Sequence, residues 1–82
     1  MMTILRKSFY PNPTKGILNL IFNNNNSSQV LIYDITGKLM YNKQLCLKNK
    51  LSQIDISNFE NGIYLIRIQQ DNQLFTAKVI KE

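Results

Sequence analysis

The stretch IYLIRIQ (residues 63–69) decides the fold of this 82-residue chain. Large apolar residues occupy every second position from Tyr64 onward, and Arg67 lies among the positions between them. Successive side chains of an extended strand point to opposite faces, so this spacing predicts a β-strand with one buried face. The preceding pair Asn61-Gly62 suits a tight turn, because both residues tolerate positive φ.

The same two-residue period continues on both sides of this stretch, between segments rich in turn-forming residues. The predicted strands are residues 4–10, 17–22, 29–35, 39–47, 51–56, 63–69 and 74–80. In the fourth, Leu39 and Tyr41 are expected on one face, opposite Asn42 and Gln44. No segment of helical length competes, and the best helical candidate, residues 56–60, is one turn long.

These strands predict an all-β fold, a sandwich of about seven antiparallel strands in two sheets. Two sheets can bury their apolar faces against each other, whereas a single sheet of this length cannot. We expect the core to close over Leu20, Ile32 and Ile66. The length allows one domain, residues 1–82, in which residues 1–7 are the remnant of a linker.

The charge pattern is cationic but dispersed. Ten Lys and Arg against five Asp and Glu give a net charge of +5, with no basic run, which indicates a solvated surface. No segment approaches the roughly 20 apolar residues that span a bilayer, so stable membrane insertion is not expected. Nucleic-acid binding is not expected either, because Tyr33 and Tyr41 lie in strands and Arg67 projects from the face opposite Tyr64.

The residue inventory predicts neither catalysis nor a cofactor. The chain has no His and one Cys, Cys46, which excludes a Cys–His pair, a Cys/His zinc site and an internal disulfide. No Asp-x-Asp-x-Asp calcium loop occurs, and we interpret Asp34 and Asp71 as turn residues whose side chains bond nearby backbone. We therefore predict no catalytic, cofactor-binding or metal-binding residues, and no enzyme.

Four segments, in order, resemble a known family. They are FYPNPTKG (residues 9–16), VLIYDITGK (30–38), IDIS with NGIYLI (54–57 and 61–66), and TAKVI (76–80). Together they resemble the type A C-terminal sorting domain of proteins exported by the type IX secretion system (the Por secretion system) of Gram-negative bacteria. The resemblance extends from about residue 8 to residue 81.

This resemblance implies an immunoglobulin-like (Ig-like) sandwich at the end of a larger cargo protein, with which it is covalently continuous. It implies transit through the periplasm, recognition by the outer-membrane translocon, and a secreted or cell-surface location. In many members a sortase-like peptidase then removes the domain and anchors the cargo to lipopolysaccharide. Because only residues 1–7 precede the first motif, we expect the cleavage site to lie outside this chain.

Carried over by position, the motifs nominate residues for translocon recognition. These are Pro11, Asn12, Pro13, Gly16, Gly37, Gly62, Tyr64 and Lys78. We favour the loop of residues 11–16 and Lys78, and we expect Gly37 and Gly62 to have positive φ. The alternative function is an adhesive or carbohydrate-binding Ig-like module, because a fold alone does not fix function.

Overall fold

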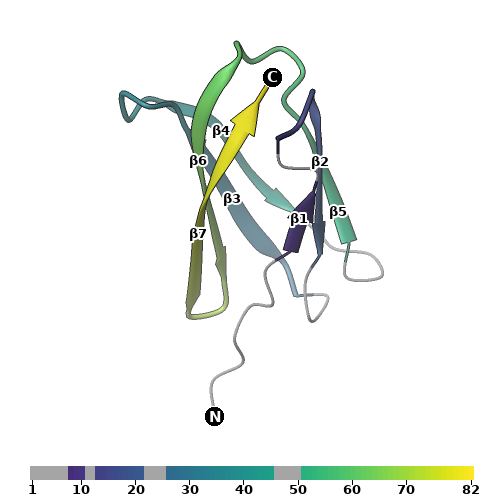
Figure 1. Ribbon diagram of the computed structural model, residues 1–82. Helices are drawn as coiled ribbons and strands as arrows, with labels where there is room; N and C mark the ends of the chain where they lie inside the picture. Colours follow the sequence, from purple (N-terminus) through teal and green to yellow (C-terminus); the bar gives the residue numbers. More distant parts are fainter. Residues whose placement is uncertain (1–7, 11–12, 22–25, 46–50) are drawn as a thin grey trace.

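The computed structural model describes residues 8–10, 13–21, 26–45 and 51–82. These residues form seven strands in two antiparallel sheets that face each other (Figure 1). The first sheet has the order β1-β2-β5 and the second the order β4-β3-β6-β7. The strands are β1 (Ser8–Tyr10), β2 (Ile17–Ile21), β3 (Ser28–Tyr33), β4 (Leu39–Leu45), β5 (Leu51–Asp55), β6 (Gly62–Gln70) and β7 (Gln73–Lys81). The predicted all-β, two-sheet architecture is confirmed.

The core lies between the sheets, where alternate residues of each strand meet. Leu20, Ile32 and Ile66 are almost fully buried, as predicted. The other buried apolar residues are Leu18, Val30, Ile54, Ile56, Tyr64, Ile68 and Val79. Removing this apolar surface from water supplies the main stabilising free energy, roughly 25 cal/mol for each Å² buried.

Two details of the β3–β4 hairpin differ from the prediction. Strand β3 ends at Tyr33 instead of residue 35, because Asp34 begins a turn that its own carboxylate closes. A register shift next to Tyr33 pairs Leu39 with Tyr33 and Tyr41 with Ile32. Paired residues of neighbouring strands lie on the same face of a sheet, and Ile32 and Tyr33 lie on opposite faces. Leu39 and Tyr41 therefore lie on opposite faces too, and the prediction that they share a face is wrong.

Several predicted positions cannot be compared with the structure. Residues 4–7 of the first predicted strand, residue 22 of the second, and Cys46 and residue 47 of the fourth lie outside the described residues. The one-turn segment 56–60 is present as a turn in which the Phe59 N–H donates to the Ile56 carbonyl oxygen at 2.9 Å.

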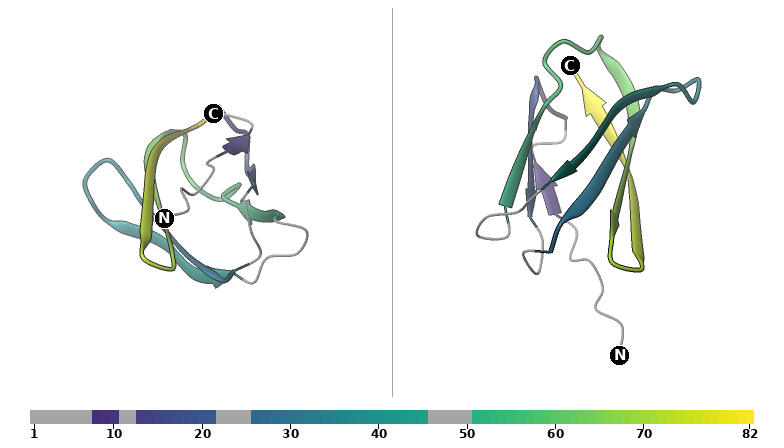
Figure 2. Two further views of the ribbon diagram at one scale, coloured as in Figure 1. Left: turned by 90° about the horizontal axis from the view of Figure 1, so that it is seen from below. Right: turned by 180° about the vertical axis from the view of Figure 1, so that it is seen from behind.

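The two sheets are linked at one end of the sandwich. Thr14, which precedes β2, forms an isolated parallel bridge with Lys81 at the end of β7. The loop before β2, the β5–β6 connection and the end of β7 gather at the upper end of the molecule in Figure 1 and again in the rear view of Figure 2. Residues from three of the four family-like segments therefore meet at this end, which we call the β7 end.

Candidate functional site

The nominated residues divide between the β7 end and the sheet face beside it. Pro11 and Asn12 lie outside the described residues. Pro13, Gly16 and Gly62 belong to the β7 end, and Tyr64 packs inside the sandwich next to it. Gly37 lies in the β3–β4 turn, and Lys78 faces outward from β7 opposite Leu65. The structure therefore brings together part of the nominated set.

Thr14 anchors the loop of residues 13–16 to the end of β7. Its N–H donates to the Ile80 carbonyl oxygen at 2.8 Å, and its own carbonyl oxygen accepts from the Glu82 N–H at 2.8 Å. Its hydroxyl donates to the Ile17 carbonyl oxygen at 2.7 Å and accepts from the Gly16 N–H at 3.1 Å. Thr14 is fully buried, and the sequence reasoning missed it. The available signal was a Thr in a Pro-Thr-Lys-Gly turn, where its hydroxyl can bond nearby backbone.

Gly16 is required by a close approach between the loop and the turn after β5. Its carbonyl oxygen accepts from the Ile56 N–H at 2.6 Å. A Cβ atom at Gly16 would lie 2.8 Å from the Ser57 Cβ and 3.1 Å from the Ser57 Cα. Those separations are shorter than ordinary carbon contacts, so only glycine fits without displacing the backbone.

Lys81, unlike the outward-facing Lys78, lies on the inward face of β7 at the β7 end. It is buried, and its Nζ lies 3.4 Å from the Asn61 Oδ1. It pairs with Gly62, whose φ of 155° is positive as predicted. The family motif nominated Lys78 for recognition. The alternation along β7, however, predicts that Lys81 lies on the same inward face as Val79. Lys81 is therefore a second residue that sequence reasoning missed.

Tyr64 fixes the β5–β6 connection against the core. Its ring lies 5.1 Å from the Phe59 ring, and its hydroxyl donates to the Glu60 carbonyl oxygen at 2.6 Å. Burial raises the pKa of the Tyr64 phenol, and the nearby Glu60 and Asp34 charges raise it further. Tyr64 is thus a neutral packing residue here, and a role in recognition stays a prediction.

The β3–β4 turn is closed by the Asp34 carboxylate. Its Oδ1 accepts from the Thr36 N–H at 2.9 Å, the Thr36 hydroxyl at 2.6 Å and the Lys38 N–H at 2.9 Å. These bonds, led by that of the Thr36 hydroxyl, lower the pKa of Asp34. Gly37 has the predicted positive φ, at 91°. The interpretation of Asp34 as a turn residue is confirmed.

Asp71, the second acid interpreted as a turn residue, lies between β6 and β7. Its φ is 56°, a left-handed conformation that Asp tolerates. Its carboxylate accepts from the side-chain amide of the distant Asn26 at 3.0 Å, so the turn position is confirmed but the partner differs from the nearby backbone that was predicted.

With this geometry established, comparison with known proteins identifies the family. The family described as "Secretion system C-terminal sorting domain" matches residues 8–82. The chain belongs to this family. It is also 29% identical over 72 residues to ulvan lyase NLR42 of Nonlabens ulvanivorans. That match covers 87% of this chain and 13% of the lyase, so the sorting domain spans a small part of that relative.

A solved structure shares the fold of the sorting domain. It is a DUF3244 family protein from Bacteroides vulgatus with an immunoglobulin-like β-sandwich fold. The TM-score is 0.73 at 20% identity, over 95% of this chain and 94% of that one. The Ig-like sandwich that the resemblance implied is therefore confirmed.

The β7 end of the sorting domain carries a surface hollow of about 600 Å³. It is lined by Pro13, Thr14, Lys15, Gly16, Ile17, Asn19, Ser57 and Glu82. Lys15 and Glu82 are its charged residues. Within the described part of the chain, no group of three or more His, Cys, Asp or Glu side chains could hold a metal ion, and no helix is long and apolar enough to span a bilayer. The arrangement suits recognition of another surface.

Proposed function

We propose that this sorting domain directs an attached cargo protein through the outer-membrane translocon of the type IX secretion system, without catalysing a reaction itself. Family membership over residues 8–82 supports the role as a sorting signal. The ulvan lyase, of which the match covers 13%, illustrates how a segment of this kind forms part of a much longer protein.

The observation that carries the proposal is the fixed geometry of the β7 end. The loop of residues 13–16 is bonded to β7 through Thr14 and contacts the turn after β5 through Gly16. Such a loop is ordered before a partner binds, so binding loses less conformational entropy. We therefore assign translocon recognition first to the hollow that this loop lines, with Pro13 and Lys15 as its exposed contacts.

The same proposal includes the later steps of export. The domain passes through the periplasm of a Gram-negative bacterium, and the cargo becomes secreted or attached to the cell surface. A sortase-like peptidase removes the domain by cutting before the first motif, and the cargo is anchored to lipopolysaccharide. The domain is the substrate of these steps and contributes no catalytic group.

An export assay tests this function. Residues 1–82 are fused behind a periplasm-directed fluorescent protein in a host with the type IX machinery, and extracellular fluorescence is measured. We expect export of the fusion and retention of the reporter alone. A reporter that stays in the periplasm with and without the domain would exclude the proposal.

Two variants focus this assay on the hollow. Lys15→Glu reverses a charge at the hollow, and Lys43→Glu makes the same change on β4, away from it. We expect Lys15→Glu to lower export and Lys43→Glu to leave it unchanged. A glycan array tests the alternative of a carbohydrate-binding module, for which retention on any glycan would be required.

A further inference from the structure

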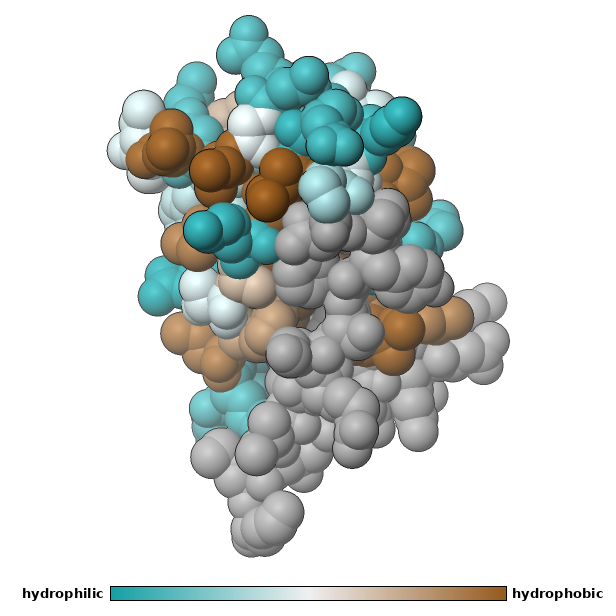
Figure 3. Space-filling view, viewed as in Figure 1, coloured by the Kyte–Doolittle hydropathy of each residue, from teal (hydrophilic) through white to brown (hydrophobic). Residues whose placement is uncertain are grey.

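The outward face of the β4-β3-β6-β7 sheet carries exposed apolar side chains, which on β6 and β7 are Ile63, Leu65, Leu74 and Ile80. Along β6 and β7 the outward pairs begin with Ile63 and Ile80 and with Leu65 and Lys78, and continue with Arg67 and Thr76 and with Gln69 and Leu74. In the space-filling view, apolar side chains lie at the surface over these two strands, among hydrophilic ones (Figure 3). Contiguous exposed apolar surface on a small domain marks an interaction site.

This face is hollowed along β3 and β6. One hollow, of about 490 Å³, is lined mainly by apolar groups that include Ile35, Ile63 and Leu65. The next, of about 540 Å³, is more polar, and its lining combines the amides of Gln29, Gln69, Asn72 and Gln73 with the apolar side chains of Leu31 and Leu74. Both hollows share Tyr33 and Arg67, so together they form one groove, which we call the outer groove.

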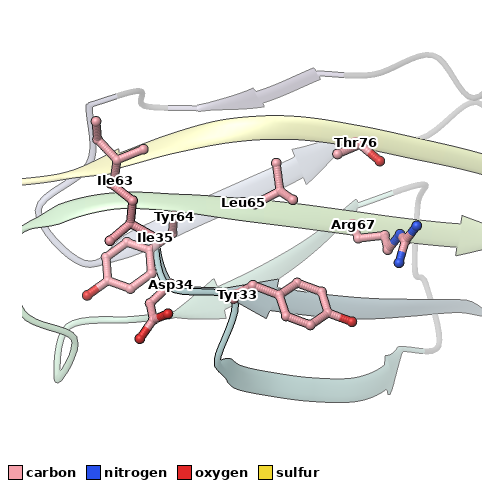
Figure 4. A pocket seen from close by; sticks show the side chains of 9 residues that line it. Tyr33, Asp34, Ile35, Ile63, Tyr64, Leu65, Arg67 and Thr76 are labelled. Atoms are coloured by element: carbon pink, nitrogen blue, oxygen red, sulfur yellow. The ribbon is translucent and has the colours of Figure 1, made fainter.

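Figure 4 shows how the side chains of the apolar half lie. Ile35 and Ile63 approach each other at one side, Leu65 lies in the middle, and Tyr33 and Arg67 occupy the other side. Ile35 is 80% exposed, yet it is carried by the turn that the Asp34 carboxylate closes. A large apolar side chain held in solvent by a fixed turn is suited to anchor a partner.

The charges around the outer groove are mainly positive. Arg67 lies where the two halves meet, and Lys78 pairs with Leu65 on the same face. The acid in the apolar half, Asp34, is engaged by hydrogen bonds within its own turn. A fitting occupant therefore has apolar side chains, followed by a carboxylate opposite Arg67, followed by polar groups that the amides can bond.

We propose that the outer groove binds an extended segment of the secretion machinery that carries an acidic residue between an apolar part and a polar part. This rests on the proposed function and names a second contact surface for it. A second copy of the chain fits less well, because each copy carries a net charge of +5 and two such copies repel each other. A membrane surface fits less well, because the groove is concave and half of it carries amides.

Site-specific photo-crosslinking tests the proposal in the exporting host. The reporter fusion carries benzoylphenylalanine in place of Leu65 in the outer groove, or in place of Leu51 on β5 as the control. The two leucines are matched in exposure, at 44% and 48%, but lie on different sheets. Mass spectrometry of the crosslinked peptide then identifies what position 65 contacts.

We expect position 65, and not position 51, to crosslink to a segment of the secretion machinery in which an Asp or Glu follows apolar residues. Crosslinks to a second copy of the domain, to lipid, or to a segment without carboxylates would overturn the proposal. So would equal crosslinking from positions 65 and 51.

Charge reversal provides the second measurement. Arg67→Glu should lower export about tenfold, whereas Lys43→Glu on β4 should change it less than about twofold. Circular dichroism of each purified variant checks that the sandwich still forms. Normal export of Arg67→Glu would exclude the outer groove and leave the proposed function standing, whereas failure of the unaltered domain to export would exclude the proposed function itself.

Discussion

Two glycine-containing loops of this domain are held in opposite ways. In the β3–β4 turn, the Asp34 carboxylate bonds the N–H groups of Thr36 and Lys38, so the turn is closed by bonds within five residues. In the loop of residues 13–16, Thr14 bonds the backbone of Ile80 and Glu82. The first loop is held by local bonds, whereas the second combines the local bonds of the Thr14 hydroxyl with contacts to residues far along the chain.

This difference bears on how the domain could be recognised. The loop of residues 13–16 is held by β7 and by the turn after β5, which lie about 40 to 68 residues further along the chain than the loop residues they contact. A partner that binds this loop therefore recognises the domain only after the two sheets have packed together. A partner that contacts Ile35 binds a turn whose conformation is set mainly by hydrogen bonds within residues 34–38. Four predictions test this contrast.

The largest effect is expected for Gly16→Ala in the long-range loop. The added Cβ would lie 2.8 Å from the Ser57 Cβ, so the loop or the turn after β5 must move. We expect a loss of about 3 kcal/mol in the free energy of unfolding, measured by urea denaturation. The double variant Gly16→Ala, Ser57→Gly should recover part of this loss. If Gly16→Ala alone were as stable as the unaltered domain, the contact between residues 16 and 57 would have room for a Cβ atom.

Thr14→Val is expected to cost about 2 kcal/mol of unfolding free energy. Valine keeps the buried volume but removes the hydroxyl that bonds the Ile17 carbonyl oxygen and the Gly16 N–H, so both backbone groups lose that bond. The matched change in the local turn is Thr36→Val, which removes an exposed hydroxyl bonded to Asp34. If both variants lose equal stability, burial of the Thr14 hydroxyl does not make its bonds more costly to lose than the exposed bond of Thr36.

Gly37→Ala in the local turn should cost about 1 kcal/mol of unfolding free energy. No atom lies within 4 Å of the added Cβ, so the cost comes only from the φ of 91°. Gly37→Asn should cost less, since Asn tolerates positive φ better than Ala. Chemical denaturation ranks the three proteins, and a more stable Ala variant would contradict the reasoning.

The smallest effect is expected for Asp34→Asn, and it depends on pH. Hydrogen bonds in the turn hold the pKa of Asp34 below its ordinary value of 3.8. A carboxylate with a depressed pKa adds stability above its unfolded pKa and loses that contribution as the pH falls through its folded pKa. The variant should therefore lose less stability than the unaltered domain between about pH 6 and pH 3.

Asp55 serves as the comparison for this titration. Bonds from Ser57 also lower the pKa of Asp55, so part of the acid sensitivity should remain in Asp34→Asn. Urea denaturation at both pH values measures the difference. Identical acid sensitivity in Asp34→Asn and the unaltered domain would show that Asp34 adds no stability to the turn.

Much of the fold was predictable because its signals are local. The strand at residues 63–69 follows from alternation, and the positive φ of Gly37 and Gly62 follows from turn chemistry. The end of β3 was misplaced by two residues, because the Asp34 turn begins inside an apolar run. The face of Leu39 was misjudged, because one residue of irregular pairing reverses the alternation.

The candidate site was less predictable than the fold. Pro13, Gly16 and Gly62 were nominated from motifs, and the structure places them at one end. Thr14 and Lys81 were missed, although they bridge the two sheets there. Each residue matters because it pairs with the other across 67 positions of the chain, and no local sequence pattern marks either one.

The sequence by itself determined the fold class of this protein through short alternating strands and turns at fixed points. These properties depend on neighbours within a few residues, where side-chain spacing and backbone preference act directly. Only the tertiary structure decided that Gly16 approaches Ser57, that Thr14 joins β7, and that Tyr33 and Arg67 share a groove. Those contacts join residues far apart in the chain, and their geometry is fixed only when the two sheets pack together.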